Sequence, residues 1–83
     1  MTINDLRLRL KIYWEDGCKS RDRSKMRRST IAAGILSWFP NDMELDEFQE
    51  QLKLFKRKGL GMAVRNTLET MCQECINEQN NLQ

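Results

Sequence analysis

The side chains with the clearest chemistry lie in one short basic segment, residues 18–28. Six of its eleven residues are basic, and one, Asp22, is acidic. Clustered lysine and arginine neutralise phosphates, and the release of counterions drives much of nucleic-acid affinity. We therefore interpret the segment as a nucleic-acid-binding site whose candidate contacts are Lys19, Arg21, Arg23, Lys25, Arg27 and Arg28.

Helix energetics support this interpretation of the segment. Positive charge at the start of a helix opposes the positive end of the helix dipole. Arg23 and Arg27 are also like charges four residues apart, which is unfavourable by roughly 0.2–0.5 kcal/mol on a helix. Charges that work against local stability are expected where a function requires them. A solvated charged loop is an equally good account of the same run.

The segment itself contains no aromatic residue. Single-strand binding by base stacking needs an aromatic platform, and the nearest candidates, Tyr13 and Trp14, precede the segment and are expected in the core. The composition therefore predicts contacts to the nucleic-acid backbone rather than to bases. Because no groove-reading motif is present, RNA is favoured over DNA.

Cys72 and Cys75 form a Cys-x-x-Cys pair, which is a weak signal by itself. A structural zinc site needs four ligands, whereas the chain has no histidine and only Cys18 in addition. A redox pair is expected at the start of a helix that follows a strand. Cys75 shares a helical stripe with Met71, so a small buried hydrophobe is the simpler interpretation. We expect no metal and no cofactor.

Equipment for catalysis is also missing from the sequence. There is no histidine and no glycine-rich phosphate loop, so we expect a non-enzymatic protein without a small-molecule substrate. The alternative to nucleic acid is a host protein, bound by an adaptor or inhibitor of the small regulatory kind that viruses and phages often encode. Its apolar contact surface would consist of Tyr13, Trp38, Met43 and Leu54.

Helices are expected to position these residues. Leu45, Phe48, Leu52 and Phe55 share one helical face, as do Val64, Leu68, Met71 and Cys75. The pattern predicts an all-α fold, one domain over residues 1–83, with a C-terminal antiparallel helical hairpin over 41–78 capped at Gly59 and a frayed tail at 80–83. The expected three or four helices lie near 3–15, 24–39, 42–58 and 61–78.

The secondary structure of the N-terminal half is less clear from the sequence. Residues 2–14 fit a helix through Ile3, Leu6 and Leu10, but they also alternate as a strand that would pair with a second molecule. Leucine, arginine and lysine favour the helix. Glu15–Gly17 is typical of a turn, and the apolar residues after Ser29 predict the most buried helix of the fold.

Length and charge set the remaining expectations. With 83 residues, 40% of them hydrophobic, a monomer would have a thin core, and we expect a homodimer. Residues 1–28 hold nine basic and four acidic side chains, a net +5, and residues 29–83 hold five and eight, a net −3. Charged residues in Met1–Leu10, short apolar runs and an odd number of cysteines predict a cytoplasmic or nuclear protein without a membrane span.

Overall fold

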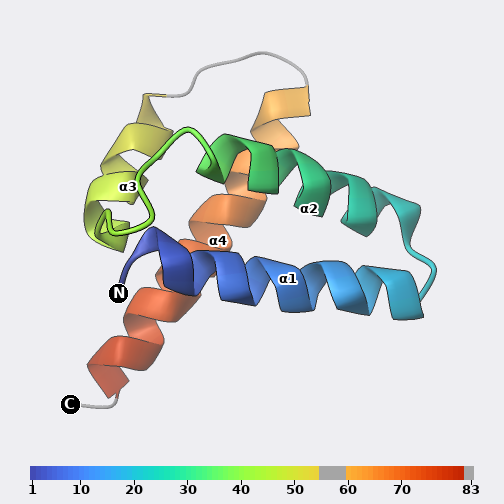
Figure 1. Ribbon diagram of the computed structural model, residues 1–83, viewed down its shortest axis with the longest axis horizontal. Helices are drawn as coiled ribbons and strands as arrows, with labels where there is room; N and C mark the ends of the chain where they lie inside the picture. Colours follow the sequence, from blue (N-terminus) through green and yellow to red (C-terminus); the bar gives the residue numbers. More distant parts are fainter. Residues whose placement is uncertain (55–59, 82–83) are drawn as a thin grey trace.

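A computed structural model of the chain describes residues 1–54 and 60–81. These ranges form four helices and no strand, which confirms the predicted all-α class (Figure 1). The helices are α1 (Ile3–Lys19), α2 (Arg23–Leu36), α3 (Leu45–Lys53) and α4 (Leu60–Asn81). No helix within the described ranges has both the length and the apolar character needed to cross a membrane.

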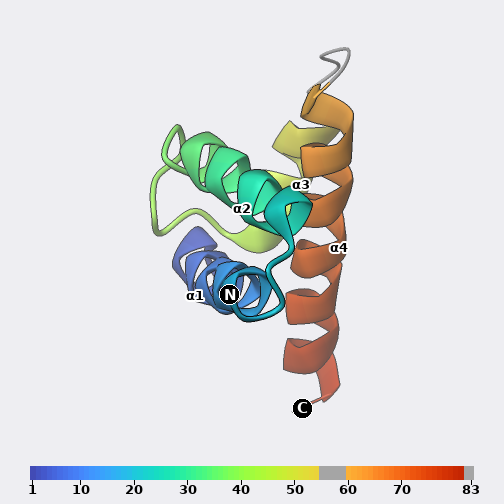
Figure 2. The same cartoon turned by 90° about the vertical axis from the view of Figure 1, so that its right-hand side faces the viewer.

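The helices form two layers. α1 and α2 lie side by side and run in opposite directions, and α4 crosses behind both (Figures 1 and 2). α3 packs against α4 near the start of α1. The predicted antiparallel hairpin of residues 41–78 stays a prediction, because residues 55–59, which include Gly59, lie outside the described residues. α4 includes residues 80 and 81 of the predicted tail, and residues 82 and 83 lie outside the described residues.

The core forms where the apolar stripes of the four helices meet. Phe48 is fully buried and packs edge to face against Phe39, with ring centroids 5.2 Å apart. The two predicted C-terminal stripes are confirmed where they are described. Their buried members are Leu45, Phe48 and Leu52 in α3 and Val64, Leu68, Met71 and Cys75 in α4.

The N-terminal residues form a helix, and the alternative strand prediction is wrong. A strand would place Leu6, Leu8 and Leu10 on one face. Leu6 and Leu10 are buried, whereas Leu8 is 59% exposed. The Thr2 amide donates to Asp5 Oδ2 over 2.8 Å, so the Asp5 side chain caps the start of α1.

The predicted turn at Glu15–Gly17 is wrong, because α1 continues to Lys19. Gly17 is buried beside Lys25 and Met26 of α2. A Cβ atom there would lie 3.2 Å from Met26 Cγ, tighter than most such contacts. The glycine therefore serves helix packing rather than chain reversal.

Two other element predictions need correction. α2 buries Ser29, Ala32 and Leu36, fewer residues than the central element was expected to bury, and α4 instead contributes most to the core. The third helix begins at Leu45 rather than near residue 42, because the preceding backbone pairs with the start of the chain. The Ile3 amide donates to the Met43 carbonyl over 2.9 Å.

Candidate nucleic-acid interface

The basic segment folds as the end of α1, a short turn and the start of α2. The Asp22 amide donates to the Gly17 carbonyl over 2.9 Å, and the Arg21 amide donates to the Cys18 carbonyl over 3.3 Å. This is the Schellman pattern, in which the residue after the helix cap takes a left-handed conformation and is usually glycine. Here it is Arg21, with φ of 55°. A left-handed residue other than glycine costs roughly 1–2 kcal/mol.

Arg21→Gly is expected to raise the free energy of unfolding by up to about 1 kcal/mol, because glycine adopts positive φ without steric strain. The same change should weaken nucleic-acid binding, since it removes an exposed cation. Urea denaturation and RNA binding measure the two effects. The matched control is Arg27→Gly, which removes the same charge inside α2 and should lower stability by about 0.5–1 kcal/mol. A destabilising Arg21→Gly would show that the arginine side chain supports the turn.

The start of α2 has the unfavourable charge placement expected from the sequence. Asp22 caps the helix, with Oδ1 accepting a hydrogen bond from the Lys25 amide over 3.0 Å. The first turn that follows contains Arg23 and Lys25 and no acidic residue. Favourable charge at this helix end is therefore limited to the cap itself.

Two of the basic residues, Lys25 and Arg28, contact Tyr13 of α1. Lys25 Nζ lies over the Tyr13 ring, 4.6 Å from its centroid, in a cation–π contact. Arg28 donates to Tyr13 Oη from Nε over 3.3 Å and from Nη2 over 3.1 Å. This side-chain hydrogen bond raises the pKa of Arg28. Both cations are half-buried and hold α2 to α1.

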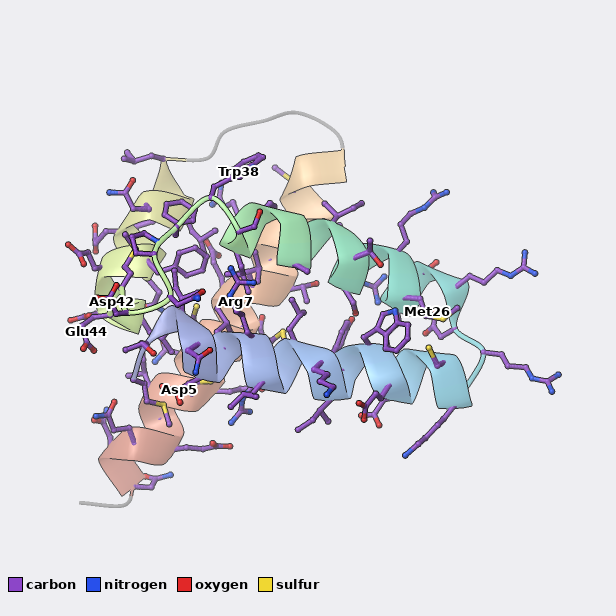
Figure 3. The ribbon with its side chains drawn as sticks, viewed as in Figure 1. Asp5, Arg7, Met26, Trp38, Asp42 and Glu44 are labelled. Atoms are coloured by element: carbon purple, nitrogen blue, oxygen red, sulfur yellow. The ribbon has the colours of Figure 1, made fainter. Side chains whose placement is uncertain are left out.

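The other four basic residues form what we term the exposed quartet, Lys19, Arg21, Arg23 and Arg27. None of them forms an ion pair within the described part of the chain. Figure 3 shows long nitrogen-tipped side chains extending from this end of the molecule, beyond Met26. The turn therefore presents four cations to solvent on one end of the α1–α2 pair.

The predicted apolar contact residues lie in different places. Trp38 and Leu54 are 59% and 73% exposed, whereas Tyr13 and Met43 are half-buried against the core. Tyr13 contacts the first turns of α2, and Trp38 follows the other end of that helix (Figure 3). Fourteen residues of helix span about 21 Å, so the structure does not bring Tyr13 and Trp38 into one patch.

Cys72 and Cys75 are both buried in α4, which confirms the small-hydrophobe prediction for Cys75. Burial raises the pKa of Cys72 to about 12 and also raises the pKa of Cys75. A reactive thiol requires the opposite, a lowered pKa and solvent access. Within residues 1–54 and 60–81, no cluster of three or more His, Cys, Asp or Glu residues is suited to hold a metal ion.

Two grooves flank α1, and sequence analysis identified neither. The first, about 450 Å³, lies between α1 and α2 and is lined by Arg7, Leu10, Lys11, Trp14, Ser29, Thr30 and Ala33. The second, about 430 Å³, lies between α1 and α4 and includes Arg9, Asp16 and Glu74. The sequence contained a signal for the groove between α1 and α2, because Arg7, Lys11 and Trp14 are spaced to share one face of a helix.

The two grooves differ in charge. In the second, Arg9 pairs with Glu74 over 3.3 Å and also with Glu78, and Asp16 adds another carboxylate. The lining of the first contains two cations and no carboxylate. Of the two, the first is therefore the one electrostatically suited to an anionic ligand.

The chain matches no family model, and no curated protein or solved structure shows detectable similarity to it. The turn between α1 and α2 provides a set of exposed cations suited to phosphate binding.

Proposed function

We propose that this protein is a small, non-enzymatic nucleic-acid-binding module, with RNA favoured over DNA. The exposed quartet supplies the contacts to the phosphate backbone. The observation that carries the proposal is Arg21, a long cation held in a left-handed conformation that glycine adopts more easily. A charged residue in such an unfavourable backbone conformation is expected where the charge takes part in binding.

Lys25 and Arg28 have a supporting role in this proposal. Their contacts with Tyr13 fix the start of α2 against the end of α1, which holds the exposed quartet together. Lys25 and Arg28 add positive charge near the bound phosphates while they keep their contacts with Tyr13. The effective number of direct contacts is therefore about four rather than six.

The salt dependence of RNA binding tests this proposal. Four phosphate contacts predict a slope of roughly −3 for log affinity against log salt concentration, at 0.7–0.9 per contact. The measurement is fluorescence anisotropy of a labelled RNA oligonucleotide titrated with the protein at several salt concentrations. Absence of binding at low salt, where charges are least screened, would refute the proposal.

The protein is further proposed to act as a homodimer. Leu8 and Ile12 lie one helical turn apart on α1 and are 59% and 60% exposed, so they form an apolar pair that the monomer's core does not use. A second copy would bring a second exposed quartet to the same nucleic acid. Sedimentation at micromolar concentration distinguishes a dimer from the 9.9 kDa chain.

A second candidate function is a protein-binding adaptor or inhibitor. The observation that favours it is the exposure of Trp38 and Leu54, two large apolar side chains. Affinity for such a partner would depend little on salt, because an apolar contact releases few counterions. The salt dependence of affinity therefore distinguishes the two functions once a binding partner has been identified.

A further inference from the structure

The groove between α1 and α2 combines an aromatic face with positive charge. Trp14 lines it and is 45% exposed, so part of the indole is open to a ligand. Arg7 and Lys11 lie on the same face of α1, seven and three residues before Trp14. Thr30 and Ala33 of α2 form the opposite wall. An aromatic platform beside cations is the combination that single-stranded nucleic acid requires.

The charge of Arg7 is oriented by a contact with the loop that follows α2. Its Nε donates to Asn41 Oδ1 over 2.9 Å, and Figure 3 shows the side chain on the α2-facing side of α1. The two terminal nitrogens of Arg7 have no hydrogen bond within the described residues. An arginine fixed through Nε keeps its outer edge for a phosphate, which it can bind with two parallel hydrogen bonds.

The dimensions also fit a short single strand. Arg7 and Trp14 are about 10 Å apart along the helix axis, at 1.5 Å per residue. A strand within a duplex rises roughly 3.4 Å per phosphate and an unstacked single strand is more extended, so this length spans at most about three nucleotides. The 450 Å³ groove is within the usual range of ligand sites, about 300–1,000 Å³. The same two helices join at the turn that carries the exposed quartet, so one strand can follow both.

We propose that this groove binds single-stranded nucleic acid, with Trp14 stacked on an unpaired base and Arg7 and Lys11 on the flanking phosphates. The inference rests on the proposed function and gives it a substrate class. A paired base cannot offer its face to Trp14, so a duplex would use the exposed quartet alone. Single strands should therefore be preferred over duplexes.

The test uses two labelled probes, a single-stranded oligouridine and an RNA duplex of the same length. Trp14→Ala is expected to weaken oligouridine binding roughly 5- to 100-fold, the usual loss for one stacked base, and to leave duplex binding within about twofold. Trp14→Phe should restore most of the single-strand affinity. Trp38→Ala is the matched control, because it removes the other tryptophan, 59% exposed and outside the groove, and should change neither affinity.

A spectroscopic measurement reports on the groove directly. In a Trp38→Phe protein, Trp14 is the sole tryptophan, and its fluorescence should be quenched when oligouridine binds. Unchanged oligouridine affinity in Trp14→Ala, equal weakening for both probes, or absence of quenching would each overturn the groove inference. If binding to both probes still depends on the exposed quartet, the proposed function stands without the groove. If the wild-type protein binds neither probe, the proposed function fails and the groove inference fails with it.

Discussion

Phe48→Ala is expected to lower the free energy of unfolding by roughly 3–5 kcal/mol. Phe48 is fully buried, and its ring packs edge to face against Phe39, so the substitution removes apolar burial and leaves a cavity. Native proteins are stable by only about 5–15 kcal/mol. For a chain of 83 residues this loss is a large part of the total. Urea denaturation followed by circular dichroism gives the value.

Leu54→Ala is the matched control for that experiment. Leu54 directly follows α3, six residues after Phe48, but it is 73% exposed and should cost less than about 0.5 kcal/mol. Phe48→Leu gives an intermediate loss and keeps the measurement possible if the alanine variant does not fold. Greater destabilisation by Leu54→Ala than by Phe48→Ala would mean that the buried face of α3 is assigned incorrectly.

Sequence periodicity correctly predicted the buried faces of α3 and α4 in the described residues. The stripe through Leu45, Phe48 and Leu52 contacts the core as expected, because a helix with a polar opposite face has one favourable orientation. Periodicity alone left residues 2–14 open to a helix or a strand, and composition favoured the helix. The burial of Ile3, Leu6 and Leu10 confirms the helix.

The ends of helices depended on packing that sequence does not show. Asp16–Gly17 has the composition of a turn, but a glycine also permits close helix approach, and only the position of Met26 decides between these roles. The actual turn contains Arg21 at the position where glycine is usual. Local propensity was therefore misleading at both residues.

The candidate site was predictable where it is continuous in sequence and not where it depends on a second helix. The basic segment was identified from composition alone. The distinction between the exposed quartet and the pair Lys25 and Arg28 comes from Tyr13, which belongs to the preceding helix. Trp14 was expected in the core, whereas it is 45% exposed and lines the groove between α1 and α2.

Reversal of three charges in the exposed quartet, Arg21→Glu, Arg23→Glu and Arg27→Glu together, is expected to weaken RNA binding by at least about 100-fold. The change removes three of about four phosphate contacts and adds repulsion in their place. Folding should persist, because all three side chains are exposed and a glutamate in place of Arg23 would lie favourably at the start of α2. Lys25 and Arg28 are left in place so that their contacts with Tyr13 continue to hold the two helices together.

A pair of single substitutions separates a local site from general electrostatic attraction. Arg23→Glu and Lys53→Glu change the net charge equally, but Lys53 lies in α3 and pairs with Glu50 over 3.1 Å. Arg23→Glu should weaken RNA binding severalfold, whereas Lys53→Glu should have little effect at moderate salt, where charges beyond about 10 Å are screened. Equal losses from the two would indicate that net charge, rather than the turn between α1 and α2, attracts the nucleic acid. Undiminished RNA binding by the triple variant would exclude the exposed quartet as the site of RNA binding.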